Sequence, residues 1–385
     1  MNSTSPVFVL VFWLICGSVF GNEVSFTVSP QLDYFPSYSK GTNQYGRSLE
    51  VKVDGYYDIT DNYRTVIELI GRLDADDSGR RIVEFRQLYA QRSFEKFDIF
   101  LGNRQAFWGT AESKNVVDII NQKDLAANQG NEAKLGSPSL SIEAYTSFGD
   151  LQIWYIPNFR EITANDVDAH PSGGLPFEPA KYERRGGKNA DDFAARFSMT
   201  SGDWDLAGSI FSGTAREPII QLGESGKSLK PTYLAQNSLG LEAQYTGEAT
   251  LLKWESIHGK QSGDAFDSAV AGLEYTYYGI FDRVWDIGLI GEVQYDTRAQ
   301  AAAKMMYSGG MRLTLNDTKD TNLLAIMTID EDSDQSLIAF EGARRITDWS
   351  SLEVSGRFFD AKTSTSTFGQ FSNDDNIRLS MNIFF

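Results

Sequence analysis

Charged side chains recur at alternate positions along this sequence, in step with apolar residues at the positions between them. Successive side chains of a β-strand point to opposite faces, so such a pattern gathers the charges on one face of a sheet. Rings of charged side chains around a water-filled path select solutes by charge. The pattern predicts a pore lining of Arg86, Arg104, Arg196, Arg312 and Arg357 on one side, with Glu68, Glu84, Glu143 and Glu292 on the other. A simpler alternative is that these charges pair with one another along the wall.

Enzyme chemistry has weak support in the sequence. The two histidines are His170 and His258, and Ser256 would share a strand face with His258. A lipid hydrolase would need a serine and a histidine held together by a third polar group, and nothing here marks a nucleophile. Clusters of His and Cys with metal-ligand spacing are absent from the sequence. We therefore expect no catalytic residue, no metal and no cofactor.

The elements that must position the charges are strands, and the last one shows the pattern best. In the segment 376–385, Ile377, Leu379 and Met381 fall on one face, while Arg378 and its polar neighbours fall on the other. About ten tilted strand residues cross a bilayer. An amphipathic edge strand of a soluble all-β protein has the same alternation, so the remaining segments must decide.

Similar segments recur from Glu23 onward and number about 18, with 16 as the alternative. Short turns and long links largely alternate between them, and the long links include 36–46, 105–138, 158–190, 213–235, 259–266 and 361–375. Outer-membrane barrels have short periplasmic turns and long extracellular loops. We therefore predict an all-β fold, a transmembrane antiparallel up-and-down β-barrel. Closure gives every backbone N–H and C=O a partner in lipid.

Composition agrees with this fold. The 385 residues have a mean hydropathy of −0.31, 13% aromatic residues and a formal charge of −17. Half of each barrel strand faces lipid and half faces water, which gives such an average. The negative charge argues against nucleic-acid binding. Residues 1–21 have the apolar core of a secretory signal peptide, which contains the single cysteine, Cys16, and residues 22–385 form one barrel domain.

The most distinctive stretch follows the fifth predicted strand. It reads Gly-Asn-Arg-Gln-Ala-Phe-Trp-Gly from Gly102, and the residues after Asn115 are too apolar for a solvated loop. The stretch resembles a porin-like family of Gram-negative outer-membrane barrels of largely unknown function, whose members carry Gly-Arg-Gln, then Trp-Gly, then Asp-x-x-Asn-Pro-x-Asp. The matching residues are Arg104, Gln105, Trp108, Gly109, Asp118, Asn121 and Asp124. Asn103 interrupts the first motif, and Gln122 replaces the proline.

The resemblance implies a barrel with a plug-like or constricting loop, and it implies no particular substrate. We therefore expect a porin-like channel in the cell outer membrane, in which small solutes diffuse through a charged aqueous lumen narrowed by the inward-folded loop 105–138. The alternative is a non-conducting barrel whose extracellular loops bind a surface partner or substrate. Expected partners are outer-membrane lipid, lipopolysaccharide, small solutes and the barrel-assembly machinery, which would recognise the strand ending at Phe385.

Overall fold

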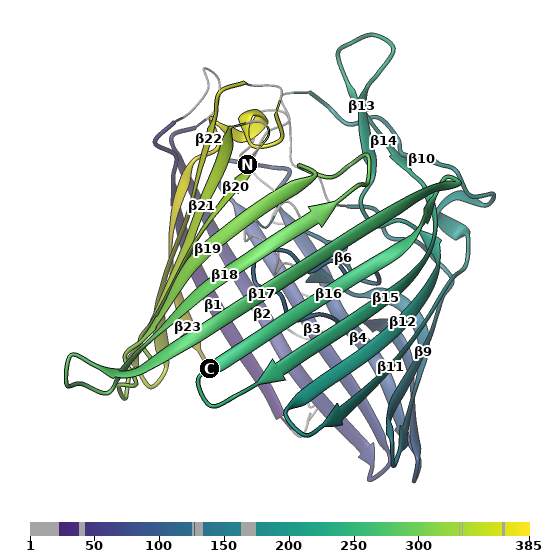
Figure 1. Ribbon diagram of the computed structural model, residues 1–385, viewed down its shortest axis with the longest axis horizontal. Coiled ribbons are helices and arrows are strands. Elements are labelled where there is room, and N and C mark those ends of the chain that lie inside the picture. Colours follow the sequence, from purple (N-terminus) through teal and green to yellow (C-terminus); the bar gives the residue numbers. More distant parts are fainter. Residues whose placement is uncertain are drawn as a thin grey trace, which may run out of the picture.

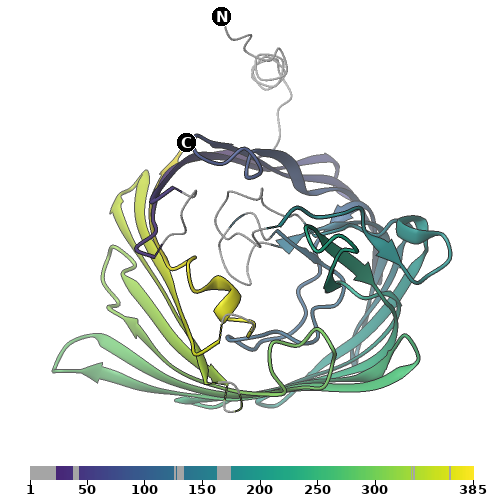
Figure 2. The same cartoon turned by 90° about the horizontal axis from the view of Figure 1, so that it is seen from above.

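The computed structural model describes residues 23–37, 43–124, 127, 134–162, 175–330, 332, 334–363 and 366–385. The predicted signal peptide lies outside the described residues. The chain forms a closed antiparallel barrel of 18 strands (Figures 1 and 2). The barrel strands are β1 (Glu23–Tyr34), β2 (Tyr45–Thr60), β3 (Tyr63–Asp74), β4 (Ile82–Ser93), β5 (Phe97–Arg104), β8 (Ser137–Thr146), β9 (Gly149–Ile156), β11 (Asp192–Ser201), β12 (Trp204–Thr214), β15 (Ala235–Thr246), β16 (Thr250–Gln261), β17 (Asp264–Ile280), β18 (Trp285–Asp296), β19 (Met305–Thr314), β20 (Asn322–Asp330), β21 (Gln335–Thr347), β22 (Ser350–Ala361) and β23 (Asn376–Phe384).

Closure joins the first strand to the last. β1 pairs with β2 on one side and with β23 on the other, so the sheet has no free edge there. Phe385 and Phe26 exchange two backbone hydrogen bonds, of 3.2 and 2.9 Å. Because the strand number is even, both ends of the barrel chain lie at the end with the short turns, where Figure 1 marks the C-terminus.

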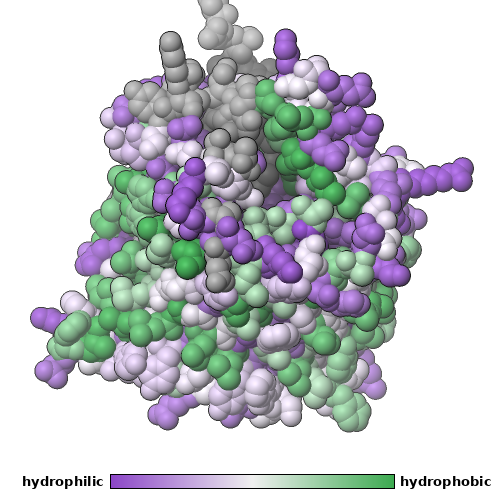
Figure 3. Space-filling model, turned by 45° about the horizontal axis from the view of Figure 1, so that its top comes forward, coloured by the Kyte–Doolittle hydropathy of each residue, from purple (hydrophilic) through white to green (hydrophobic). Residues whose placement is uncertain are grey.

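The alternation of apolar and polar residues sorts the two faces as predicted. Large apolar side chains on the outer face remain exposed, and Leu101, Leu239 and Leu241 are 64%, 59% and 61% accessible. In Figure 3 the hydrophobic residues gather over the side of the barrel, and the hydrophilic ones crowd toward the end with the long links. Polar residues of the same strands, such as Glu255 and Arg378, are buried inside.

One predicted long link proved to be wrong. The region 259–266 forms a tight hairpin, because β16 continues to Gln261 and β17 begins at Asp264. The two residues of the turn, Ser262 and Gly263, have φ values of 52° and 89°. Left-handed conformations at both central positions match the twist of two-residue hairpins. The small and polar residues on either side therefore belong to strands.

A β-bulge in β4 changes the face of the sheet on which Tyr89 lies. The register of β3 against β4 shifts so that Glu68 lies opposite Gln87 while Leu69 lies opposite Phe85, which leaves Arg86 as an extra residue. An extra residue reverses the alternation beyond it. Tyr89 consequently lies inside the barrel, where its ring packs 5.9 Å from that of Phe100. Strict alternation along β4 would instead put Tyr89 on the outer face with Val83 and Phe85, which are exposed.

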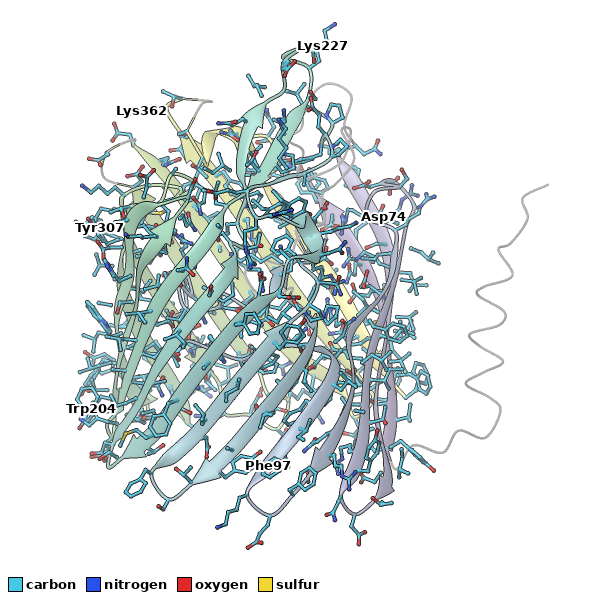
Figure 4. The ribbon with its side chains drawn as sticks, turned by 90° about the vertical axis from the view of Figure 1, so that its right-hand side faces the viewer. Asp74, Phe97, Trp204, Lys227, Tyr307 and Lys362 are labelled. Carbon is cyan, nitrogen blue, oxygen red and sulfur yellow. The ribbon has the colours of Figure 1, made fainter. Side chains whose placement is uncertain are left out.

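Shorter elements lie in the long links. β6 (Gln122–Lys123) pairs with β7 (Lys134–Leu135), and β10 (Lys181–Tyr182), β13 (Ile219–Leu222) and β14 (Leu229–Tyr233) form a small sheet. Figure 4 shows this sheet standing above the barrel, with Lys227 at its tip, whereas Phe97 and Trp204 lie toward the opposite end. The 3-10 turns in the described residues are η3 (Gly187–Asn189) and η4 (Gly369–Phe371).

Candidate functional site

The segment 105–124, here called the inward segment, lies inside the barrel. Figure 2 shows it within the ring of strands. Most of its apolar side chains are buried, with Trp108 1%, Val117 0% and Ile120 0% exposed, whereas Phe107 is exposed. They form one cluster with side chains of the inner wall, which include Trp154, Phe211, Ile257, Phe266 and Val270. The apolar residues after Asn115, which indicated that this loop is not solvated, are thus buried against β9, β12, β16 and β17.

Glu255 on β16 is the central polar anchor of the inward segment. Its Oε1 accepts hydrogen bonds from the backbone N–H groups of Thr110 and Ala111, at 2.5 and 2.7 Å, and its Oε2 accepts one from Val116 at 3.0 Å. The Glu255 side chain is 0% exposed. A buried carboxylate has four lone-pair sites, and here backbone donors of the segment fill three of them.

Two further wall carboxylates hold the same segment. Glu242 on β15 accepts the Gly109 N–H at 3.1 Å. Glu292 on β18 accepts the N–H groups of Glu112 and Ser113 at 2.9 and 2.8 Å. Backbone N–H groups away from a regular ladder must find acceptors when they are buried. The three carboxylates therefore accept six of the backbone N–H groups between Gly109 and Val116 and fix the distance of the segment from the wall.

Side chains of the motif close the segment on itself. Asn121 accepts the Ala106 N–H at 2.8 Å and donates to Asp118 at 2.7 Å. Asp118 also pairs with Lys134 of β7 at 2.7 Å. Asn115 accepts the Asp118 N–H at 2.9 Å. The predicted loop residues Asp118 and Asn121 therefore hold the start and the end of the segment together.

The other motif residues connect the segment to the wall. Gln105 donates to the Lys134 carbonyl at 2.8 Å, and Trp108 Nε1 donates to Gln152 of β9 at 2.9 Å. Asp124 pairs with the buried Arg72 of β3 at 3.3 Å. Gly109 has φ of +85°, and a Cβ there would lie 2.2 Å from the Asn115 side chain. Glycine at this position is thus required both by conformation and by space.

The predicted pore-lining residues all lie on barrel strands, and seven of the nine form an ion pair. Two pairs join predicted residues to each other, Arg104 with Glu143 at 2.6 Å and Arg86 with Glu68 at 3.7 Å. The remaining contacts are Arg196 with Glu242 at 2.8 Å, Arg312 with Glu112 at 2.9 Å and with Glu274 at 3.3 Å, and Glu84 with Arg160 at 2.7 Å. Arg357 lies on β22 opposite Asn376 of β23. Some of these partners lie on the wall, whereas Glu112 belongs to the inward segment and Arg160 to the link after β9. The role of these residues in lining a solute path stays a prediction.

The sequence did not single out Glu242 or Glu255. Both occupy polar positions of their strands, as many other charged residues do. Glu242 and Glu255 differ from the other charged residues because they accept hydrogen bonds from backbone groups more than 130 residues away. The periodicity of a strand does not indicate such distant contacts. The clue that the sequence offers is an acidic residue in the middle of a strand, because a charge at membrane depth is costly without a partner.

The contacts of His258 do not assemble a hydrolase site. His258 Nδ1 lies 2.7 Å from an Asp267 oxygen, and the Ser256 hydroxyl accepts the indole N–H of Trp254 at 3.2 Å. No hydrogen bond joins Ser256 to His258 in the part of the chain that the structure describes, and His170 lies outside that part. Among the described residues, no group of three or more His, Cys, Asp or Glu side chains is placed to hold a metal ion.

The closed barrel is the fold of outer-membrane proteins, and structural comparison agrees. OccAB3 of Acinetobacter baumannii is similar over 94% of this chain and 98% of its own, with a TM-score of 0.56 and 9% identity. OccK11 (OpdR) of Pseudomonas aeruginosa is similar over 94% and 95%, with a TM-score of 0.55 and 10% identity. Wzi of Escherichia coli, a carbohydrate-binding β-barrel involved in group 1 capsule assembly, is similar over 99% and 89%, with a TM-score of 0.54 and 11% identity.

No protein-family model matches the sequence, and no curated protein matches it. The structural likeness, at these identities, establishes the fold. The chain is a multi-pass β-barrel of the outer membrane, with porin-like barrels among its structural neighbours.

Proposed function

We propose that the protein is a porin-like channel through which small solutes diffuse passively. Barrels of about 16 to 18 strands are wide enough to leave an aqueous channel. The observation that carries the proposal is the inward segment, which is held on the inner wall by Glu242, Glu255 and Glu292. Such a segment narrows a lumen at a defined height, as the predicted constriction loop 105–138 would.

The wall charges suit this function. Arg104, Arg196 and Arg312 keep acidic partners beside them, so their charges stay at transmembrane depth without facing lipid. We further propose that the leader 1–21 is removed on export and that the strand ending at Phe385 is the segment recognised during barrel assembly. Outer-membrane lipid and lipopolysaccharide would contact the apolar outer face.

Solute entry into liposomes tests the channel function. Proteoliposomes that contain the folded chain 22–385 are expected to swell in isosmotic arabinose and glucose, and more slowly in sucrose and raffinose, because the inward segment sets a size limit. Liposomes with heat-denatured protein are the control. Folded protein that admits none of these sugars would contradict the proposal.

A second candidate is a barrel whose outer loops bind a surface partner, and the small sheet of β10, β13 and β14 favours it. This sheet stands above the barrel and exposes Ile220 and Leu222, which are 46% and 65% accessible. Wzi, a similar barrel, binds carbohydrate. Replacing 219–233 by a short turn distinguishes the candidates, since a channel would keep its swelling rates and a surface-binding barrel would lose its partner.

A further inference from the structure

A pocket of about 210 Å³ lies where the inward segment meets the link between β12 and β14. The inward segment contributes Lys123, the link contributes Arg216, Glu217 and Ile220, and Arg298 follows β18. The pocket is smaller than the about 300 to 1,000 Å³ of sites for drug-sized ligands, so one small molecule would fill it. Segments far apart in sequence thus enclose a single space at the end of the barrel with the long links.

The charges around this pocket are unbalanced in favour of cations. Four cationic residues line it, namely Lys123, Lys134, Arg216 and Arg298, against two acidic ones, Asp118 and Glu217. The acidic residues directly behind the lining do not restore the balance. Asp192 is shared by Arg216 and Arg184, and Asp296 is shared by Arg298 and Lys114. A positive site in a chain of formal charge −17 is a local feature that general composition does not produce.

The cationic residues around the pocket also surround the carboxylate of Glu217 and affect its pKa. Its carboxylate lies 3.2 Å from Lys123 and 3.5 Å from Arg298, which come from separate links. Burial alone would raise the pKa of Glu217, but the charges of Lys123, Arg298 and Lys114 outweigh it and hold that pKa well below its usual range. Glu217 therefore stays ionised, and Glu217 and Asp296 together still leave these three cations with one positive charge in excess.

One donor in the lining has no acceptor. Arg216 is 8% exposed, its Nε donates to the Ile120 carbonyl at 2.9 Å, and its Nη1 donates to Asp192 at 2.7 Å. Its Nη2 is buried and has no hydrogen-bond partner among the described residues. A buried N–H of a charged group without an acceptor is costly, so a ligand oxygen at this position would be favoured.

We propose that this pocket binds a small organic carboxylate, with the hydroxyl-bearing acidic sugars as the best-fitting class. One oxygen of a carboxylate can accept a hydrogen bond from Nη2 of Arg216, and its negative charge balances the excess of cationic side chains around the pocket. The amides of Gln236 and Gln261, which also line the pocket, can bond hydroxyl groups. This inference rests on the proposed channel function in one respect: it takes the pocket to be a binding site along the path of the solute.

Calorimetric titration of the folded, detergent-solubilised chain tests the proposal without any ionic current. The probes are glucuronate, glucose and glucosamine, which share a sugar ring and differ in charge. Glucuronate is expected to bind most tightly, glucose more weakly and glucosamine least. Equal binding of all three, tighter binding of glucosamine, or no binding of glucuronate would overturn the proposal.

Matched variants place the binding in this pocket. Lys123→Gln should weaken glucuronate binding by about fivefold, the scale of one charge pair, whereas Lys227→Gln, at the tip of the β13–β14 hairpin, should leave it unchanged. Ile220→Trp should fill the pocket and abolish binding, whereas Leu222→Trp on the same strand should not. If both tryptophan variants bind normally, the ligand sits elsewhere. Conductance of the wild-type chain, measured separately, shows whether the channel function itself fails.

Discussion

The backbone N–H of Ala111 donates to the carboxylate of Glu255 at 2.7 Å and so ties the inward segment to β16. Glu255→Gln replaces one acceptor oxygen by an NH₂ group that faces further N–H donors. We expect this variant to free part of the segment and raise single-channel conductance. Its free energy of unfolding should fall by about 1–3 kcal/mol, the cost of leaving buried donors unpaired.

A matched control for this variant is Glu353→Gln. Glu353 also lies on the barrel wall, on β22, where it accepts a hydrogen bond from Asn382 of β23, and among the described residues no hydrogen bond or ion pair joins it to the inward segment. Its conductance should equal that of the wild type. Equal conductance of all three proteins would show that Glu255 does not set the width of the path.

Phe107 and Trp108 are adjacent in the inward segment and have opposite environments. Phe107 is 73% exposed, whereas Trp108 is 1% exposed and belongs to the apolar cluster on the wall. Phe107→Ala should change the free energy of unfolding by less than about 0.5 kcal/mol and raise conductance, because it removes bulk from the interior space. Trp108→Ala should cost about 3–5 kcal/mol. Urea unfolding and planar-bilayer recordings of both variants check this, and a destabilised Phe107→Ala would contradict it.

The seam between β1 and β23 contains a buried ion pair. Arg378 donates to the two carboxylate oxygens of Asp33 at 2.7 and 3.0 Å, and the two side chains are 3% and 0% exposed. Asp33→Ala leaves a buried guanidinium without its main partner, so it should lower the free energy of unfolding by about 3–5 kcal/mol.

Two comparisons make this prediction specific. Asp58→Ala removes the partner of the more exposed Arg64 and should cost about 1 kcal/mol or less. The double variant Asp33→Leu with Arg378→Leu should recover part of the lost stability, because Arg378 is removed with its partner, while Arg80, which also pairs with Asp33 at 3.4 Å, keeps its ion pair with Asp74 at 3.5 Å. A cost for Asp33→Ala as small as that for Asp58→Ala would show that the seam pair contributes little to closure.

The lowered pKa of Glu217 predicts how the pocket responds to acid. The folded pKa is below the unfolded one, so the ion pairs of Glu217 contribute stability above the usual carboxylate pKa, about 4.3, and lose it only as the pH falls through the lower folded value. The difference in unfolding free energy between wild type and Glu217→Gln should therefore stay constant from pH 7 to about pH 5 and shrink below that. NMR titration of labelled glutamate carboxyl carbons, with Glu217→Gln to assign the signal, is the direct measurement. A midpoint at or above about 4.3 would contradict the prediction.

The sequence predicted the barrel because each strand shows its two faces locally. The last strand, β23, begins at Asn376, where the alternation of the segment 376–385 begins. The bulge at Arg86 was not predicted, since an extra residue in one strand is visible only against its partner strand. The hairpin at Ser262 was missed because its polar neighbours resemble a loop.

The candidate site was predicted less completely than the fold. The motif residues Asp118 and Asn121 hold the inward segment, and their side chains bond within it, so local sequence indicated them. Glu255 accepts hydrogen bonds from residues about 140 positions away, and only closure of the barrel brings the two together. Strand periodicity gives the face of a carboxylate and says nothing about which distant donors will meet it.

The single-channel conductance of the folded chain 22–385 in a planar bilayer tests the central claim most directly. The channel account predicts stable open steps, larger steps when the segment 109–116 is replaced by a short glycine-serine link, and a reversal potential in a salt gradient that reports the dominant wall charge. A folded barrel that gives no steps, or whose steps are unchanged by that replacement, would contradict a channel narrowed by the inward segment.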